Sequence, residues 1–478
     1  MKLALVALAA CAPPTALPQT SPWIDDTSMP AAAPTPIADH YRDAAAKIIA
    51  AARPDRGAYA KLAQLTDKIG HRLAGSTALD HAIAWAVQTM KDDGLAVHTE
   101  KVMVPHWVRG AEDAAITLPL SHPLHVLTLG GSVATPKGGI TAPIVVVHDW
   151  KELDAKHEQV KGAIVVYNVA MPAWTPEHGS GYGDTVVYRG KGASEAAKRG
   201  AVAALVRSVT ARSLSTLHTG AMHYDDGVAK IPTAALTVED TELLDRLAAK
   251  GAVTIHLRLE PQMLPDVESA NVIGELRGRD KPDEVVVIGG HLDSWDVGQG
   301  AHDDGAGCVT MMQAAHLLHQ LGLVPRRTIR VVLFTNEENG VRGGKGYAQQ
   351  HAAELPSTVL AVESDSGGFA PRGFSIGHRD APAASRMRAR IADIATLLAS
   401  LNAQRITVGH GGTDIEPMEA AGVPQVALDV DNRLYFDYHH TDADTLDKVD
   451  PASLSDMTAA VAVLAFVVAD LPARIDAP

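Results

Sequence analysis

Five short segments in the second half of this chain place acidic residues or histidines directly after apolar runs that predict buried strands. The segments are His291-Leu-Asp293, Asp303-Asp304-Gly, Glu337-Glu338-Asn, Asp365-Ser-Gly-Gly and His439-His440-Thr. Each segment alone has an ordinary interpretation as a helix cap, a turn or a solvated loop. Five in order, where strands of an α/β sheet are expected to end, predict instead a hydrolase that uses two metal ions.

The composition is that of a globular protein and argues against nucleic acid as a partner. The length of 478 residues corresponds to two or three domains of ~100–200 residues each. Hydrophobic residues make up 46% of the chain and charged residues 21%, which is enough apolar material for a core. The net charge is −14, whereas phosphate binding needs a basic surface. The two cysteines, Cys11 and Cys308, exclude a disulfide scaffold.

The first residues have the pattern of an export signal. Lys2 gives a positive start, and Leu3–Ala10 is an apolar run too short to span a bilayer. The sequence Leu-Ala-Ala-Cys11 resembles a bacterial lipoprotein signal with a lipidated cysteine, and a plain secretory signal is the alternative. The Pro-rich stretch that follows predicts a disordered tether, so residues 1–37 stand apart from the fold. We expect an exported protein, either a lipoprotein anchored in the periplasm or a secreted one.

The pattern of apolar residues and of Gly and Pro divides the remaining chain into a split domain and an insertion. Residues 38–120 begin with helical periodicity and then alternate like a strand. Short β-like runs punctuated by Gly and Pro dominate residues 121–260, which predicts an inserted β-rich domain without ligand candidates. The α/β pattern resumes in 261–478, with short apolar runs that suit a mixed, mostly parallel sheet flanked by helices. The apolar stretch Thr458–Val468 is bounded by acids and predicts a core helix.

The ligand candidates have the donor atoms that a pair of metal ions requires. An imidazole with a carboxylate two residues later, as in His291 and Asp293, is typical of a ligand and the group that orients it. A carboxylate such as Asp303 can bridge two cations by giving one oxygen to each, and Asp304 is then an orienter or a helix cap.

Adjacent glutamates follow the strongest predicted strand, Ile329–Phe334. Burying two charges without partners is costly, so one glutamate is interpreted as a ligand and the other as the general base that deprotonates water. An exposed loop with two solvated acids is the alternative. Asp365 is either a ligand or an ordinary turn residue, and His440 is either a ligand or part of a surface loop. The mixture of oxygen and nitrogen donors suits zinc, with cobalt or manganese also compatible.

These segments together strongly resemble peptidase family M28, whose members use two zinc ions. Three further motifs, Ile69–Ser76, Gly411–Pro417 and Tyr435–Thr441, are similar to its carboxypeptidase Q branch. The resemblance covers about residues 38–472. It implies the phosphorylase/hydrolase-like aminopeptidase fold with an inserted protease-associated domain at 121–260, and it implies a homodimer.

Residue by residue, the resemblance also implies the roles at the site. One zinc would be held by His291, Asp303 and Asp365, and the other by Asp303, Glu338 and His440. Glu337 would be the general base, Asp293 would orient His291, and the peptide bond between Asp303 and Asp304 would be cis. A donor to the oxyanion could come from His410, Tyr435 or Tyr438, although packing is the more ordinary role of each.

The sequence therefore predicts an exported dizinc exopeptidase that hydrolyses dipeptides or short peptides. A glutaminyl-cyclase-like enzyme with a single zinc is one alternative, and a non-catalytic binding ectodomain on the same fold is another. The complete set of ligands and base favours hydrolysis. Side-chain preference, the native metal, the role of the insertion and the choice among aminopeptidase, carboxypeptidase and dipeptidase action stay open.

Overall fold

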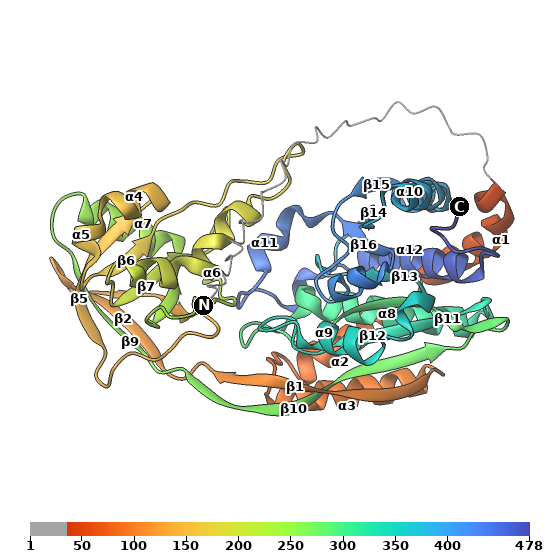
Figure 1. The fold of residues 1–478 in the computed structure, drawn as a ribbon, viewed down its shortest axis with the longest axis horizontal. Coiled ribbons are helices and arrows are strands. Elements are labelled where there is room, and N and C mark those ends of the chain that lie inside the picture. The colour runs from red at the N-terminus through yellow and green to blue at the C-terminus, as the bar shows by residue number, and fades with distance from the viewer. Residues whose placement is uncertain (1–35) are drawn as a thin grey trace, which may run out of the picture.

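The structure, a computed structural model, describes residues 36–478 and has two lobes (Figure 1). The expected export signal and Cys11 lie outside the described residues. Two long antiparallel strands, β1 (Ala96–Val108) and β10 (Gln262–Leu276), run from one lobe to the other. The chain thus enters the second lobe after β1 and returns from it along β10.

The first lobe is built on an eight-stranded mixed sheet in the order β1-β10-β12-β11-β13-β16-β14-β15. Its central strands β12 (Arg327–Phe334), β11 (Lys281–His291), β13 (Thr358–Glu363) and β16 (Gln425–Val430) are parallel. Strands β14 (Pro371–Gly377) and β15 (Arg405–Val408) form one edge. Because the parallel strands run in one direction, their carboxyl ends meet at the same edge of the sheet.

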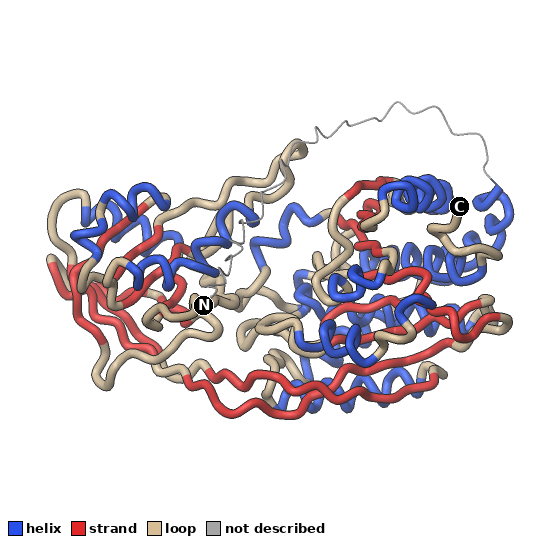
Figure 2. Tube along the Cα trace, in the orientation of Figure 1, coloured by secondary structure: helices blue, strands red, loops and turns tan. Residues whose placement is uncertain are grey.

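Helices cover both faces of this sheet (Figure 2). Helices α1 (Pro36–Ala52), α2 (Gly57–Lys68), α3 (Thr77–Asp92), α8 (Ala306–Gln320), α10 (Ala381–Ala395) and α12 (Pro451–Asp470) share the larger core. The smaller core on the opposite face includes α9 (Arg342–Gln350) and the 3-10 turn Glu416–Ala421. Alternation along β11 explains both cores, because Val286 and Ile288 enter the first and Val285 and Val287 the second.

Helix α12 is the one helix of residues 36–478 that is long and apolar enough to cross a membrane. However, 83% of its most apolar window is buried inside the protein, where it packs against α8 and α1. Its N-terminus is capped by Asp450, which accepts a hydrogen bond from the Ser453 N–H. The burial identifies α12 as a core helix of the first lobe.

The second lobe contains another eight-stranded sheet, in the order β3-β2-β9-β5-β6-β7-β8-β4. The strands are β2 (Glu112–Leu118), β3 (His122–Leu124), β4 (Val126–Thr128), β5 (Ile140–Val147), β6 (Ile164–Tyr167), β7 (Ala203–Arg207), β8 (Thr233–Leu236) and β9 (Thr254–Leu259). Its helices are α4 (Trp150–Ala155), α5 (His157–Val160), α6 (Tyr182–Lys198) and α7 (Val238–Ala248). We propose that this lobe is the inserted domain placed at 121–260, with β2 joining its sheet before residue 121.

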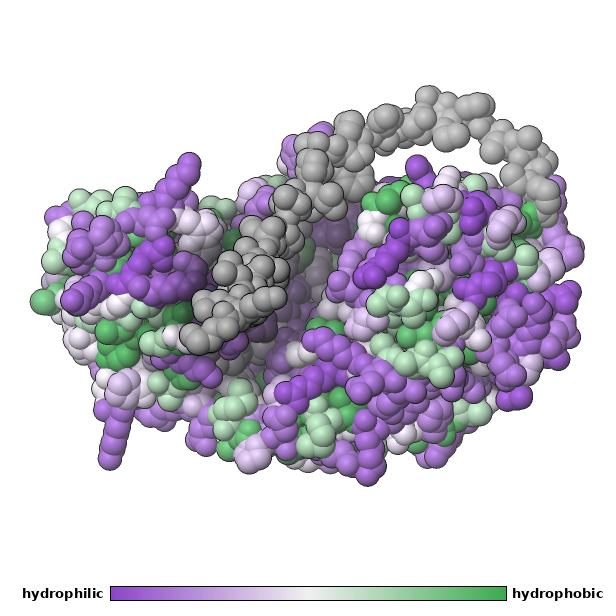
Figure 3. Space-filling model, in the orientation of Figure 1, coloured by the Kyte–Doolittle hydropathy of each residue, from purple (hydrophilic) through white to green (hydrophobic). Residues whose placement is uncertain are grey.

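Hydrophilic side chains predominate on the face of the molecule shown in Figure 3, with apolar ones scattered among them. The large exposed apolar side chains of the described residues include Leu214, Met263 and Val408. Scattered exposed apolar residues are normal for a globular surface.

Candidate metal centre

The chain brings the predicted ligands together at the carboxyl ends of the central strands. His291 is the last residue of β11, Glu337 and Glu338 follow β12, and Asp365 follows β13. Asp303 lies in the turn before α8, and His440 follows the short helix α11 (Tyr435–Tyr438). All these residues except Asp365 and Glu337 are buried. Open α/β sheets characteristically form their sites at this edge.

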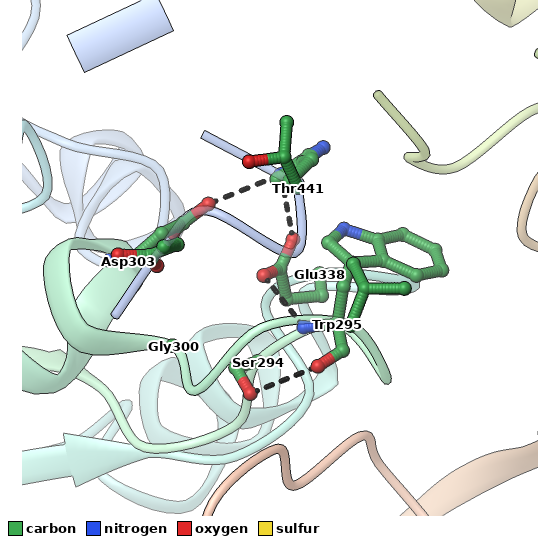
Figure 4. Close-up of a pocket in the computed structure, with 9 residues that line it drawn as sticks. Ser294, Trp295, Gly300, Asp303, Glu338 and Thr441 are labelled. Carbon is green, nitrogen blue, oxygen red and sulfur yellow. Dashed lines mark hydrogen bonds and ion pairs between the residues drawn. The ribbon is translucent and has the colours of Figure 1, made fainter. Parts of the chain in front are cut away.

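Asp303 stands between the two histidines. The His291 Nε2 atom lies 3.2 Å from Asp303 Oδ1 and 3.5 Å from Asp365 Oδ1. The His440 Nε2 atom lies 3.2 Å from Asp303 Oδ2 and 3.1 Å from Glu338 Oε2. Asp303 therefore presents one oxygen to each histidine, and Glu338 lines a cavity of about 10 Å³ beside it (Figure 4).

Hydrogen bonds on the far side of each imidazole fix which nitrogen faces this centre. The Nδ1 of His291 lies 3.0 Å from the backbone oxygen of Asp293, and the Nδ1 of His440 lies 3.2 Å from the backbone oxygen of Thr219. A carbonyl oxygen can only accept, so Nδ1 donates in both rings and the lone pair is at Nε2. In both rings Nε2 is therefore the atom that faces the carboxylates, and it would give its lone pair to a bound metal ion.

The centre also contains buried polar atoms without a hydrogen-bond partner among the described residues, His291 Nε2 and Asp303 Oδ2. Such orphans are rare because burying an unsatisfied polar atom is costly. Imidazole nitrogen and carboxylate oxygen are donors that a divalent cation would satisfy. The residues present therefore fit bound metal ions.

A second histidine, His439, also lies close to the centre. Its Nε2 is 3.6 Å from Asp303 Oδ2, and its ring stacks on that of His440 with 3.5 Å between centroids. The family resemblance implied His440 as the ligand of this pair. The structure brings His440 close to two carboxylates, Asp303 and Glu338, and that difference favours His440 as the ligand.

Asp304 joins the strand end to the helix start. Its carboxylate accepts from the N–H of His291 and from the N–H of Gly307, each at 3.1 Å, so it acts as orienter and cap together. A Cβ at Gly307 would overlap the Ser364 carbonyl and this carboxylate, and so only glycine fits there. The Asp303–Asp304 peptide bond is cis, as the resemblance implied.

The carboxylate of Asp293 does not contact His291 closely, since its Oδ1 is 3.8 Å from Nδ1. It accepts instead from the backbone N–H of Glu337 at 3.0 Å and of Glu338 at 3.4 Å. Asp293 therefore orients His291 through its backbone oxygen, while its side chain holds the segment that carries both glutamates.

Burial raises the pKa of the Glu337 carboxyl well above its ordinary value, and the nearby carboxylates of Asp365 and Glu338 raise it further. Burial likewise raises the pKa of Glu338 to about 7, with Asp303 adding to the effect. A carboxylate with a raised pKa accepts a proton more readily near neutral pH.

The three residues suggested as oxyanion donors occupy different places. The Tyr435 hydroxyl donates to Asp365 Oδ1 at 3.5 Å, so it lies beside the ligands. The ring of Tyr438 stacks on His302, with 5.5 Å between centroids. The side chain of His410 is 58% exposed, and its Nε2 lies 3.7 Å from Glu416. The structure thus brings Tyr435 to the centre and leaves His410 on the surface.

Two supporting residues were missed at the sequence level. Arg72 is fully buried, and its guanidinium donates to the backbone oxygens of Gly70, Leu292, Gln299 and Gly300. It therefore holds the loop between His291 and Asp303. Asp444 accepts from the N–H of His302 at 2.7 Å and of Asp303 at 3.2 Å. Arg72 lies in the Ile69–Ser76 motif, which was its only signal in the sequence.

Comparison with known proteins gives a consistent result. The sequence pattern described as peptidase family M28 matches residues 271–465. Carboxypeptidase Q from Mus musculus is 42% identical over 437 residues, which are 90% of this chain and 90% of that protein. The crystal structure of a peptidase M28 precursor from Shewanella amazonensis SB2B is similar, with a TM-score of 0.86 and 36% identity over 91% of this chain and 98% of that one. A zinc aminopeptidase from Bacillus subtilis shares the fold, with a TM-score of 0.62 and 20% identity over 85% and 93% of the two chains.

The fold and these relatives define a metallo-exopeptidase. The chain belongs to peptidase family M28, within its carboxypeptidase Q branch. The predictions of family, enzyme class and a mixed, mostly parallel α/β sheet flanked by helices are confirmed.

Proposed function

We propose that this protein is a dizinc exopeptidase of dipeptides or short peptides. The observation that carries the proposal is the position of Asp303, whose two carboxylate oxygens each lie 3.2 Å from a different imidazole. A carboxylate placed this way is suited to bridge two cations. The name of the relatives, carboxypeptidase Q, supports action at a peptide terminus.

The described residues would divide into two ligand sets that share Asp303. His291, Asp303 and Asp365 would hold one zinc ion, and Asp303, Glu338 and His440 would hold the other. The oxygen and nitrogen donors suit zinc, and cobalt or manganese are compatible with the same set. When bound, two zinc ions supply Lewis-acid polarisation of the scissile carbonyl and lower the pKa of the attacking water.

The protein's own side chains handle the proton. Glu337 would take a proton from the attacking water, a step that its raised pKa favours, and would then return that proton to the leaving amine. Asp293 would hold Glu337 in place through the backbone N–H. The Tyr435 hydroxyl, next to Asp365, would donate to the oxyanion. Tyr438 and His410 keep packing and surface roles in this scheme.

The test combines metal content with hydrolysis. Purified protein is analysed for metal per chain, and a panel of dipeptides is hydrolysed before chelation, after chelation and after zinc is restored. We expect two zinc ions per chain and activity that returns with zinc. One zinc per chain with full activity would overturn the two-metal proposal and favour the single-zinc alternative. Two bound metals without hydrolysis of any peptide would favour a binding ectodomain.

Dipeptides with one terminus chemically blocked then show which peptide terminus the enzyme requires to be free. Each active dipeptide is compared with its N-acetylated form and its C-terminal amide. Loss of activity on acetylation indicates a required free amine, loss on amidation a required free carboxylate, and loss on both a dipeptidase.

We further propose that the protein is exported with Cys11 as its lipid anchor and that it assembles as a homodimer. The Leu-Ala-Ala-Cys11 segment supports the first and the family resemblance the second. Membrane fractionation of wild type and Cys11→Ala tests the anchor, because the variant should become soluble. Sedimentation of the metal-loaded protein tests the dimer.

A further inference from the structure

The two lobes meet at a reciprocal pair of hydrogen bonds between Thr219 of the second lobe and His440 of the candidate metal centre. The Thr219 N–H donates to the backbone oxygen of His440 at 3.1 Å. The His440 Nδ1–H donates back to the backbone oxygen of Thr219 at 3.2 Å. These residues are 221 positions apart in the chain. The orientation of a first-lobe imidazole is therefore set by a second-lobe carbonyl.

Thr219 is itself held by hydrogen bonds from the second lobe and from Arg109, which directly follows β1. Its carbonyl accepts a second hydrogen bond, from Arg189 Nη1 at 3.2 Å, so both lone pairs of that oxygen are used. Its hydroxyl donates to the Thr128 carbonyl at 3.2 Å and accepts from Arg109 Nη2 at 3.4 Å. Arg109 in turn pairs with Asp296 of the first lobe. The carbonyl thus has a fixed direction.

Arg189 and Gly220 fit closely behind this carbonyl. Arg189 is buried, and the structure shows no acidic partner for it among residues 36–478. Gly220 has φ of +138°, and a Cβ there would overlap the Arg189 guanidinium. Only glycine therefore allows the arginine to reach the Thr219 carbonyl. The guanidinium also lies over the Tyr182 ring, 5.6 Å from the ring centroid. A buried arginine that is hydrogen-bonded to a backbone oxygen is suited to fix that oxygen rather than to neutralise an acid.

The second lobe also contacts the residues just before His440. The Tyr182 ring stacks on Phe436, with 4.4 Å between centroids and 18° between planes. The Arg212 guanidinium pairs with Asp437, with Nε 2.8 Å from Oδ2. Both contacts come from the second lobe, so the segment that carries His440 is held along much of its length.

We propose that the second lobe positions the His440-side metal site, with the Thr219 carbonyl and Arg189 as positioning residues. The Thr219 carbonyl fixes the Nδ1–H tautomer and aims the Nε2 lone pair at the position between Asp303 and Glu338. Among residues 36–478 the His291-side site receives no such contact from the second lobe, because its Nδ1 is held by Asp293 within the first lobe. The inference rests on the proposed two-metal function and gives the inserted domain a role beyond covering the site.

The experiment measures metal affinity rather than turnover. Metal-free wild type, Arg189→Ala and Arg199→Ala are titrated with zinc in competition with a chromophoric chelator. Arg199 follows the same helix and pairs with Asp154 and Glu195 on the surface, so it is a matched control. We expect Arg189→Ala to weaken one of two sites by roughly 10–100-fold, as loss of support behind a ligand does, and to leave the other unchanged.

Two further variants test the same inference if Arg189→Ala does not fold. Gly220→Ala displaces the guanidinium without removing it and should weaken the same single site, while Arg189→Lys keeps one donor and should restore most of the affinity. Circular dichroism and the melting temperature establish that each variant is folded. Unchanged affinity at both sites in folded variants, or equal weakening of both, would overturn the inference. Fewer than two zinc ions in wild type would overturn the proposed function instead.

Discussion

The carboxylate of Asp293 accepts a hydrogen bond from the backbone N–H of Glu337 at 3.0 Å, and its backbone oxygen accepts from His291 Nδ1 at the same distance. One residue therefore ties a candidate ligand to the candidate base. The same carboxylate also accepts from the Glu338 N–H at 3.4 Å. The base and its neighbouring ligand are thus held by a single fully buried acid.

Glu337→Gln should abolish turnover while both metals stay bound. The amide keeps the size of the side chain and cannot accept the proton from water, so kcat should fall by at least about 100-fold, the lower end of what a general base contributes. Peptide hydrolysis and metal content per chain are measured on the same preparation. The conservative Asp283→Asn, an exposed acid at the start of β11, is the control and should leave both unchanged. A near-normal kcat in Glu337→Gln would show that Glu337 is not the general base.

Gly307→Ala should disturb the centre through Asp304. The added methyl overlaps the Asp304 carboxylate and the Ser364 carbonyl, both part of the packed core, so we expect a loss of about 1–3 kcal/mol in stability. Activity should fall as well, because Asp304 holds the His291 backbone. Gly190→Ala is the control, since no atom lies near its Cβ position. Equal melting temperatures and activities for the two variants would contradict this account.

Part of this candidate site could be predicted from the sequence because its chemistry depends on the types of side chain present. The sequence alone offers His291, Asp303, Glu338, Asp365 and His440 as candidates, and each lies at or just after a strand end or beside a helix end. Strand ends are readable because short apolar runs stop abruptly where the sheet edge meets solvent or a loop.

The rest could not be read because it depends on the backbone. The Thr219 contact uses a carbonyl oxygen, which every residue possesses, and it joins two lobes across a separation that no local pattern encodes. The same holds for Asp293, where the sequence predicted a carboxylate that orients His291 and the structure uses the backbone oxygen instead. Arg72 was visible only as part of a motif, because its partners are four carbonyls.

The contribution of Glu338 and Asp444 to the stability of the metal-free protein should fall as the pH rises. Glu338 has a pKa of about 7 in the folded protein, against an ordinary value of 4.5, because burial and Asp303 raise it. Asp444 is raised to about 7 by burial as well. A group whose pKa is higher in the folded than in the unfolded protein stabilises the fold at pH values below its unfolded pKa. That contribution is lost as the pH rises through its folded pKa. The loss therefore occurs between about pH 4.5 and 7. Asp303 has a lowered pKa and titrates below this window.

Thermal melts at pH 5 and pH 8, with a chelator and with zinc, measure this effect. The chelated protein should melt at a lower temperature at pH 8, and zinc should reduce the difference because cations stabilise the ionised carboxylates. Glu338→Gln should make the decline with pH shallower in the chelated protein. A chelated protein that melts higher at pH 8 than at pH 5 would contradict the sign of the effect.

Leu464→Ala should destabilise the first lobe from its core. Leu464 is completely buried in α12, between that helix and the sheet core, and removing a buried leucine side chain costs about 2–5 kcal/mol. Leu464 is not one of the candidate site residues. At low temperature kcat should therefore equal that of the wild type, while the melting temperature falls. Leu214→Ala is the matched control, because Leu214 is 94% exposed and its truncation should change the melting temperature little. If both variants melt alike, α12 is not the stabilising element that its burial indicates.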